Sequence, residues 1–444
     1  MVLSIILLYC DQRWDIVEKF RLIIPRDRKV ASWCLYDVGN SAFATTIMAA
    51  VLPVYFREIA APFLKGSLPT AFWGYTSASA LLCCAVAAPF LGAIGDMVRK
   101  KKMMLTIFTL LGVLASAGLF FVDYGHWQSA LVLMALGTIG FSASMIFYDS
   151  LLPHIVPLDQ VDMVSSQGYA FGYLGGGVLL AINLAMIWLL PGTLGPRLSF
   201  LSVALWWGAF SLPILIFIPE PPAKTLLVRR RKSIAGEAIL RLRETFSEIR
   251  QYQDLFRFLV AFWFYNDGVG TMIRMAAIYG ANVGISMAHL VGALLLTQFV
   301  GVPFSLFFGR LAARIGSKKT ILMGLAGYTA ISFGAFFLSQ AWHFWILAFA
   351  VGTVQGGTQA MSRSLYASLL PPSRSAEFFG FYDISSKFAG VIGPAIFGLI
   401  THITGSSRMG VAVVATTFIV GGLLLIKVDV HRGIKNVSQQ NSLQ

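Results

Sequence analysis

Charged residues are scarce in this 444-residue sequence, and their scarcity excludes most classes of soluble protein. Aspartate, glutamate, lysine and arginine make up 12% of the chain, whereas hydrophobic residues make up 57% and the mean hydropathy is +0.73. Soluble globular domains typically contain about 25% charged residues. The composition therefore predicts a membrane protein.

The residue types that catalysis and metal binding require are also few. The four cysteines, Cys10, Cys34, Cys83 and Cys84, are not spaced as a metal-binding set. The six histidines are scattered, mainly at the ends of apolar runs, and suggest neither a metal site nor a catalytic triad. The sequence contains no glycine-rich loop of the kind that cradles a nucleotide phosphate. We therefore predict no catalytic residues, no metal, no cofactor and a protein that is not an enzyme.

Long apolar runs are what the chain has instead. A helix of about 20 apolar residues crosses a bilayer core of about 30 Å. The predicted spans are 31–56, 71–94, 103–122, 128–151, 166–190, 198–218, 256–281, 287–311, 320–340, 343–369, 378–403 and 408–428. These runs predict an all-α polytopic membrane protein with twelve transmembrane helices in two six-helix halves. The expected domains are an N-terminal cytoplasmic or interfacial segment (1–29), an N-terminal bundle (30–218), a basic cytoplasmic linker (219–255), a C-terminal bundle (256–429) and a cytoplasmic tail (430–444).

Positive charge is unevenly distributed between the predicted loops. The net charge is +14, and the basic residues cluster in alternate loops at 99–102, 224–243, 314–319 and 427–435. Loops rich in lysine and arginine stay in the cytoplasm, so we expect both termini there, in a multi-pass protein of the cell (inner, cytoplasmic) membrane. Basic clusters beside spans suit the head groups of membrane lipids, and we expect no nucleic-acid partner.

The two halves of the chain share a pattern. Tyr148-x-Ser-Leu-Leu-Pro153 matches Tyr366-x-Ser-Leu-Leu-Pro371 at an offset of 371 − 153 = 218 residues. Gly172-x-x-Gly175 falls on Gly390-x-x-Gly393 at the same offset. A gapless match half a chain apart predicts two structurally equivalent halves, which is typical of transporters with a central binding site.

The loops after the second and eighth predicted spans carry related motifs. The first reads GAIGDMVRKK from Gly92, with Asp96 four residues after the glycine, and the second reads GRLAARIGSKK from Gly309, with Arg314. Both resemble the signature loop of the major facilitator superfamily. A carboxylate at a helix end can accept hydrogen bonds from arginines or from the amino end of another helix. We therefore expect Asp96 and Arg314 to belong to a cytoplasmic gate. The alternative is that these charges only set the topology.

The first span and the stretch 362–400 extend the resemblance. The first span contains WCLYDVGNSAFAT from Trp33 and LPVYF from Leu52. Together with SRSLYASLLPPSRSAEFFGFYDISSKFAGVIGPAIFGLI from Ser362, it resembles the autophagy-related vacuole effluxer family and its bacterial relatives within the major facilitator superfamily. The resemblance covers residues 30–430. It implies a transporter and, by analogy with the vacuolar members, an exporter of amino acids.

Polar groups within the first and seventh spans are candidates for binding and coupling, because charges inside a membrane usually face a cavity or a partner. A buried carboxylate can take up and release a proton near neutral pH, and a guanidinium can hold a carboxylate with two hydrogen bonds. We expect Asp267 or Asp37 to be the coupling acid and Arg274 to bind a substrate carboxylate. The substrate and proton-coupling residues that we predict are Asp37, Asn40, Asn266, Asp267, Arg274, Tyr36 and Tyr265. The alternatives are a permanent Asp267–Arg274 ion pair and a packing role for Asp37.

A second set of charges lies at the predicted cytoplasmic ends of the spans. Asp383 and Lys387 are four residues apart on one helical face. Asp149, Arg363 and Lys387 have no charged counterpart at the offset of 218. Charges unique to one half suit pairing across the cleft, so we assign Asp149, Arg363, Asp383 and Lys387 to the gate. The alternative is a set of static pairs at helix ends.

These predictions together describe a secondary transporter. We expect a monomer that exports small polar solutes such as amino acids by alternating access, coupled to protons. The alternatives are export of drug-like or sugar-derived compounds, a lipid flippase and a non-transporting membrane receptor. A flippase should have a lateral opening towards lipid, and a receptor should have a cavity plugged by bulky side chains.

Overall fold

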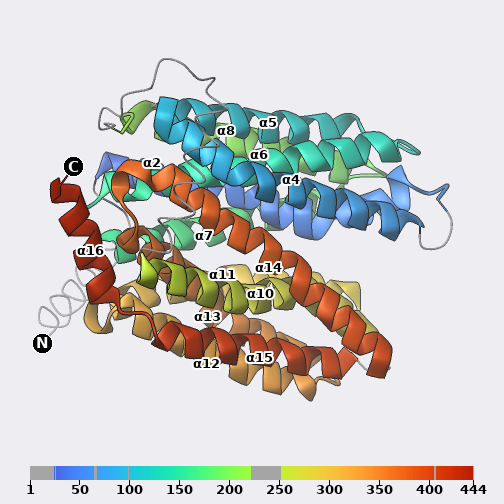
Figure 1. Ribbon diagram of the computed structural model, residues 1–444. Helices are drawn as coiled ribbons and strands as arrows, with labels where there is room; N and C mark the ends of the chain where they lie inside the picture. The colour runs from blue at the N-terminus through green and yellow to red at the C-terminus, as the bar shows by residue number, and fades with distance from the viewer. Residues whose placement is uncertain are drawn as a thin grey trace, which may run out of the picture.

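The computed structural model describes residues 25, 27–64, 68–98, 100–221, 252–404 and 407–443, and these residues are helices joined by short connections (Figure 1). Six long helical spans precede residues 222–251 and six follow them. The first six are a continuous span made of α2 (Arg28–Ala42), η1 (Phe43–Val51), α3 (Leu52–Tyr55) and η2 (Phe56–Ala60), then α4 (Leu68–Val98), α5 (Lys101–Gly118), α6 (Trp127–Ile155), α7 (Val161–Leu189) and α8 (Leu194–Phe217). The second six are α10 (Gln253–Asn282), α11 (Met287–Ile315), α12 (Ser317–Phe336), α13 (Ala341–Leu369), α14 (Ser375–Thr404) and α15 (Ser407–Ile426).

A helix lies at every predicted span, and eight of the described helices are by themselves long and apolar enough to cross a membrane. The other four, α10, α12, α13 and α14, contain charged residues such as Asp267, Lys318, Arg363 and Lys387. A charged side chain inside a membrane is stable only where it meets a partner or a polar cavity. The least apolar helices are therefore the first places to look for function. Most of the segment predicted at 1–29 and of the linker predicted at 219–255 lies outside the described residues.

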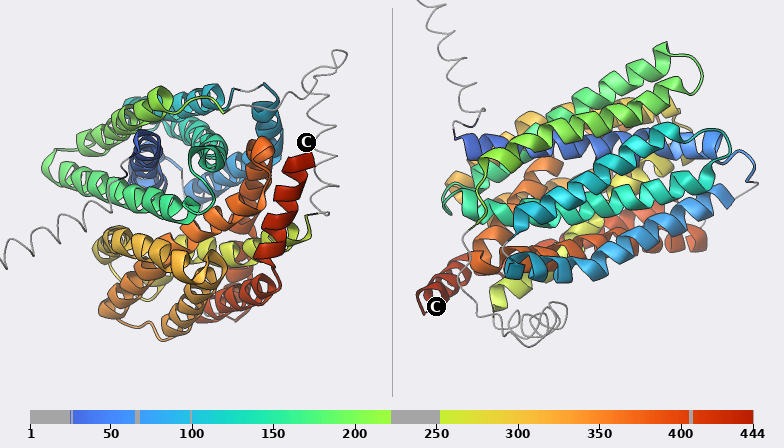
Figure 2. Two further views of the ribbon diagram at one scale, coloured as in Figure 1. Left: turned by 90° about the vertical axis from the view of Figure 1, so that its left-hand side faces the viewer. Right: turned by 90° about the horizontal axis from the view of Figure 1, so that it is seen from above.

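The two halves form separate groups of helices that meet along two seams. Helices of residues 28–217 lie on one side of the molecule and helices of residues 253–426 lie on the other (Figures 1 and 2). α4 packs against α14 along one seam, and α7 packs against α11 and α13 along the other. We call the end of the bundle where α4 ends and α5 begins the linker end, because α8 also ends there and α10 begins there.

Glycines bring α4 and α14 into backbone contact near the linker end. A Cβ atom on Gly92 would lie inside van der Waals contact of the carbonyl oxygen of Ala376, and one on Gly380 would lie 2.6 Å from the carbonyl oxygen of Ala88. Only residues without a side chain allow two helices to approach this closely. The two halves are thus packed backbone to backbone at this end.

The first span is not a regular α-helix. Residues Phe43–Val51 form the π-helix η1, and Phe56–Ala60 form a second π-helix, η2. π-helical segments are rare and are often found at functional sites. The first of these segments contributes Ala44, Thr45 and Ala49 to the wall of the cavity described below.

The residues predicted as a cytoplasmic tail form a further helix, α16 (Val430–Leu443), which packs against α10 and α13 at the linker end (Figure 1). The guanidinium of Arg432 donates to both carboxylate oxygens of Asp254, from Nε at 2.6 Å and from Nη2 at 2.7 Å. The backbone N–H of Asp429 donates to the same carboxylate at 3.0 Å. Asp254 at the start of α10 therefore attaches the beginning of α16 to the bundle.

We expect the Arg432→Ala variant to loosen α16, because this substitution removes a two-pronged, charge-assisted hydrogen bond. Amide hydrogens of α16 should exchange with solvent several-fold faster than in the unmodified protein, as measured by hydrogen–deuterium exchange. Lys435→Ala, an exposed position on the same helix, is the matched control and should leave exchange unchanged. Equal exchange in the two variants would mean that the Asp254–Arg432 pair does not fix the helix.

Candidate functional site

A cavity of about 670 Å³ lies between the two halves. It runs from Asp37 and Arg363 towards Val54 and Leu338, near the ends of the first span and of α12 that lie away from the linker end. Most of its wall is apolar. The polar and charged side chains in its lining are Asp37, Asn40, Ser41, Thr45, Tyr169, Tyr173, Thr271, Tyr279, Thr297, Gln298, Gln355, Gln359 and Arg363. The cavity can therefore receive an amphipathic solute of small size.

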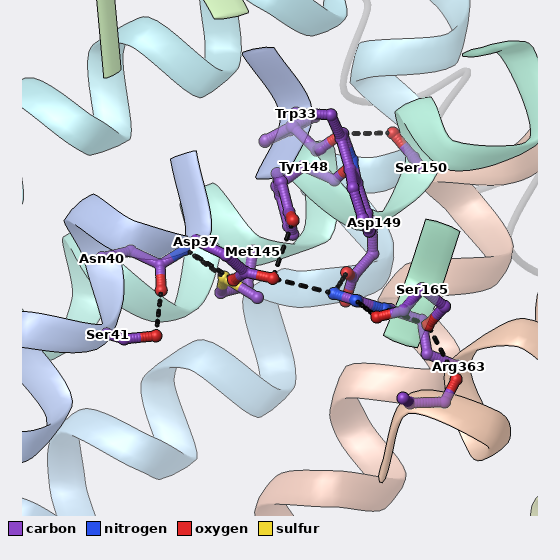
Figure 3. Close-up of polar contacts among 12 residues, drawn as sticks. Trp33, Asp37, Asn40, Ser41, Met145, Tyr148, Asp149, Ser150, Ser165 and Arg363 are labelled. Atoms are coloured by element: carbon purple, nitrogen blue, oxygen red, sulfur yellow. Dashed lines mark hydrogen bonds and ion pairs between the residues drawn. The ribbon is translucent and has the colours of Figure 1, made fainter. Parts of the chain in front are cut away.

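Arg363 on α13 closes the inner end of this cavity and is 1% exposed. Its Nη1 lies 3.1 Å from Oδ1 of Asp149 on α6 and 3.5 Å from Oδ2 of Asp37 on α2 (Figure 3). Its Nε donates to the hydroxyl of Ser165 on α7 at 3.0 Å, and its Nη2 donates to the carbonyl oxygen of Ser165 at 2.9 Å. A guanidinium from the second half thus joins three helices of the first half.

Aromatic rings surround the same guanidinium. The Cζ atom of Arg363 lies 4.5 Å from the ring centroids of both Trp33 and Tyr169, and 5.6 Å from that of Tyr148. Trp33 and Tyr148 stack with their centroids 4.5 Å apart, and Trp33 Nε1 donates to the carbonyl oxygen of Tyr148 at 3.1 Å. A cation over aromatic faces is attracted by their electron density, more strongly when water is excluded.

Asp37 is fixed by hydrogen bonds on both of its oxygens. The hydroxyl of Tyr148 donates to Oδ2 at 2.8 Å, and Nδ2 of Asn40 donates to Oδ1 at 3.2 Å (Figure 3). Asp37 and Asn40 both line the cavity, whereas Asp149 does not appear in its described lining. The cluster contains two carboxylates and one guanidinium, so its net charge is −1 when both carboxylates are ionised. Of the two carboxylates, Asp37 is the one that lines the cavity.

The structure joins residues that the sequence analysis assigned to different groups. Asp37 was predicted with the substrate residues, and Asp149 and Arg363 with the gate, but all three form one cluster. Asp383 and Lys387 pair with each other within α14 at 3.3 Å. Asp383 and Lys387 are not among the described residues that line the cavity.

The seventh-span group lies away from the cavity in this conformation. Oδ1 of Asp267 accepts a hydrogen bond from the backbone N–H of Gly393 on α14 at 2.8 Å, and Asn266 Nδ2 lies 3.4 Å from the hydroxyl of Ser386 on the same helix. Neither these two residues nor Arg274, whose side chain is exposed, belongs to the described lining. Asp267 and Asn266 are thus engaged by α14 in this conformation.

Both predicted tyrosines also point away from the cavity. The hydroxyl of Tyr36 is 2.8 Å from that of Thr109 on α5, and the hydroxyl of Tyr265 is 2.7 Å from that of Ser362 on α13. Tyr36 and Tyr265 are almost fully buried. Their hydrogen bonds connect helices within one half, so in this conformation they pack the bundles and do not face a solute.

Asp96 joins the two halves at the linker end. Oδ2 of Asp96 accepts a hydrogen bond at 2.8 Å from the backbone N–H of Glu377, in the first turn of α14, and Oδ1 pairs with Lys101 Nζ at 2.8 Å. The same Nζ donates to the hydroxyl of Ser375 at 2.7 Å, and that hydroxyl donates to the carbonyl oxygen of Ser150 at 2.9 Å. A carboxylate beside the positive end of a helix is electrostatically favourable.

The other seam has a different polar link, which the sequence analysis missed. Asp162, at the start of α7, accepts hydrogen bonds from the hydroxyls of Ser317 on α12, at 2.8 Å, and of Ser364 on α13. Arg314, which was predicted to belong to the cytoplasmic gate, lies in the last turn of α11 and is exposed. The link thus uses serine hydroxyls of the second half, and the repeat pattern gave no signal for it.

Further residues of the site were also missed. Trp33, Tyr148, Ser165, Tyr169 and Lys101 were not predicted to take part. Tyr148 belongs to the repeated Tyr-x-Ser-Leu-Leu-Pro pattern, and Lys101 belongs to the basic cluster after Asp96, so each had a signal that was interpreted only as repeat or topology. No sequence pattern distinguishes Ser165 from the other serines of the chain.

Comparison with known proteins gives a consistent family. The family described as "Vacuole effluxer Atg22 like" matches residues 68–438. The chain is 36% identical over 420 residues to the "Uncharacterized MFS-type transporter YxiO" of Bacillus subtilis, covering 93% of this chain and 97% of that protein. It is 24% identical over 515 aligned residues to "Autophagy-related protein 22-1" of Phaeosphaeria nodorum, covering 92% of this chain and 91% of that protein.

Solved structures of major facilitator proteins share the fold. The human organic anion transporter MFSD10 superposes with a TM-score of 0.74 at 13% identity, over 90% of this chain and 100% of that chain. The proton:xylose symporter XylE superposes with a TM-score of 0.70 at 14% identity, over 90% of this chain and 95% of that chain. A bacterial homologue of ferroportin in an outward-facing state superposes with a TM-score of 0.65 at 14% identity, over 90% and 98% of the two chains. The major facilitator fold and its multi-span membrane architecture, both predicted from the sequence, are thereby confirmed.

Proposed function

Because this chain belongs to the Atg22-like vacuole effluxer family of major facilitator secondary transporters, which are not enzymes, we propose that it exports small amino-group-containing solutes, amino acids foremost, in exchange for protons. Asp37 carries the proposal: its carboxylate lies at the inner end of the cavity and shares Arg363 of the other half with Asp149. The matching family is named an effluxer, which supports the direction.

The shape of the molecule supports alternating access. The cavity lining reaches the end of the first span that lies away from the linker end. Towards the linker end the two halves are joined by contacts between α4 and α14, and by those of Arg363 with Asp37, Asp149 and Ser165. We assign the linker end and both termini to the cytoplasm, because the basic loops adjoin that end. The conformation is then outward-facing, and transport requires the contacts at the linker end to break while those at the other end form.

Asp37 is better placed than Asp267 to couple protons to this change. A proton entering from the outside can reach Asp37 through the cavity, whereas the Asp267 carboxylate binds the backbone of α14. A proton on Asp37 removes one of the two negative charges that hold Arg363, which weakens the link between the halves at the linker end. Opening at that end then lets the proton leave into the cytoplasm and lets a solute amino group bind the carboxylates.

The test is transport in vesicles that contain the purified protein and a panel of amino acids. We expect Asp37→Asn to reduce proton-driven flux to the level of empty vesicles, because asparagine cannot carry a proton. Solute-for-solute exchange should continue at a reduced rate, because the carboxylate of Asp149 remains to bind the amino group. Asp267→Asn is the control and should retain both activities. If Asp37→Asn keeps proton-driven flux, or loses both activities together with protein abundance, Asp37 is not the coupling acid.

The apolar wall of the cavity supports a second candidate function, export of drug-like compounds. Side chains such as Phe141, Met145 and Phe344 line it. The same vesicles distinguish the two functions, since an exporter of drug-like compounds should move protons with amphipathic amines and not with amino acids.

A further inference from the structure

The guanidinium of Arg363 is a cation bound in a site that is built entirely by the other half of the molecule. Its ion pairs, its hydrogen bonds and its ring contacts among the described residues are all with α2, α6 or α7 of the first half, whereas Arg363 lies on α13 of the second half. We call this set the cation cage; it consists of Trp33, Asp37, Tyr148, Asp149, Ser165 and Tyr169.

The cation cage has the chemistry of a receptor for an organic cation. Its two carboxylates supply charge, and three aromatic rings supply faces at 4.5–5.6 Å from the central carbon of the guanidinium. The hydroxyl and carbonyl oxygens of Ser165 accept from two different nitrogens of the fork. Aromatic walls with carboxylates are the usual means of recognising ammonium and guanidinium groups.

Space for the cation depends on a glycine. A Cβ atom at Gly168 would lie 3.0 Å from Nη2 of Arg363 and 2.9 Å from Oδ2 of Asp37. The backbone of α7 therefore forms one wall of the cation cage at close range. The absence of a side chain at Gly168 thus leaves the space that the guanidinium of Arg363 occupies.

We propose that the cation cage binds the alkylammonium or guanidinium group of a solute whenever Arg363 withdraws with the second half, and that the returning Arg363 displaces that group towards the cavity. This inference rests on the alternating access of the proposed function. In the outward-facing conformation Arg363 occupies the cage; in the opposite conformation the six groups remain together on the first half and face the cytoplasm. The fork geometry at Ser165 favours guanidinium over ammonium of equal charge.

Removing the internal cation provides the first test. The purified Arg363→Ala protein is heated with butylguanidinium, with the neutral isostere butylurea, or with sodium chloride at equal ionic strength. We expect butylguanidinium alone to raise the Tm, by about 3 °C at 100 times its Kd, because a ligand that binds only the folded state stabilises it by mass action. The matched control Arg274→Ala removes an arginine from outside the cage and should show no such rise.

A variant that retains Arg363 keeps the test decisive if Arg363→Ala does not fold. Gly92→Ala should hold the halves apart at the linker end and vacate the cage, because its Cβ would overlap the backbone at Ala376. Butylguanidinium should then raise the Tm of Gly92→Ala and not that of Gly74→Ala, whose new Cβ would have no neighbour within 4 Å. Equal shifts in variant and control, or no shift in either variant, overturn the proposal.

The outcomes also separate this inference from the proposed function. If vesicles exchange amino acids for protons but butylguanidinium stabilises neither variant, the cation cage binds only Arg363 and the transport proposal is unaffected. If butylguanidinium stabilises the variants as expected but no solute moves protons, the cage stands as a cation site and the coupled export of amino acids does not.

Discussion

The Arg363→Met variant is expected to lose about 3–5 kcal/mol of unfolding free energy, because removing one partner of a buried ion pair leaves an uncompensated charge. Here the remaining charges would be the carboxylates of Asp37 and Asp149, both of which are buried. The loss is measured by denaturant unfolding of the purified protein. Arg310→Met, at an exposed position of α11, should cost less than about 1 kcal/mol.

A variant that lacks all three charges identifies the cause of the lost unfolding free energy. Combining Arg363→Met with Asp37→Asn and Asp149→Asn removes all three charges while keeping side chains of similar volume. A buried ion pair replaced as a whole by neutral side chains is often neutral in stability. We therefore expect the triple variant to recover most of the lost stability while proton-driven transport stays absent. A triple variant as unstable as Arg363→Met would show that the arginine acts through packing against Trp33 and Tyr169.

Gly92→Ala is expected to have the largest effect on the conformational equilibrium. The added methyl group would overlap the backbone of α14 in the conformation described, and overpacking of this kind costs about 1–3 kcal/mol. Since α4 and α14 belong to different halves, separation at the linker end relieves the overlap. Such a cost shifts an equilibrium about 5- to 150-fold, so export should fall by a similar factor.

Hydrogen–deuterium exchange shows whether the linker end has opened. Amide hydrogens in the first turn of α14, including that of Glu377, which Asp96 binds here, should exchange faster in Gly92→Ala. Gly74→Ala lies on the same helix in open space and should match the unmodified protein in both export and exchange. If Gly92→Ala exports at a normal rate with slower exchange at Glu377, the close approach of α4 and α14 is not part of the transport cycle.

The fold could be predicted from the sequence because a membrane span is a property of local composition. The run predicted at 128–151 corresponds to α6, and the run predicted at 166–190 corresponds to α7. α16 was expected as a tail because a short helix of mixed composition has no such signal. It is fixed by Asp254, which lies far from it in the sequence.

The candidate site could be predicted only in part. The cost of charge in a membrane identified Asp37, Asp149 and Arg363 one by one, but the face of a helix on which each lies depends on how helices distant in sequence pack. For this reason Arg363 was separated from Asp37, and Arg274 was assigned a role in the cavity. The positions of aromatic residues such as Trp33 predict even less about a site, since aromatic side chains occur in contact with lipid, at membrane interfaces and around bound cations.

The π-helix η1 has a consequence for comparing the two halves of the chain. Each α-helical residue advances the helix by about 100°, so a turn closed by i→i+5 hydrogen bonds contains an extra residue that changes the rotational phase of everything after it. The seventh span, α10, is α-helical throughout its described length, whereas the first span contains η1. A gapless alignment of the first span with the seventh therefore cannot pair equivalent faces on both sides of η1. Deleting one residue within Phe43–Val51 would restore a common phase and turn the outer part of the first span away from the solute pathway.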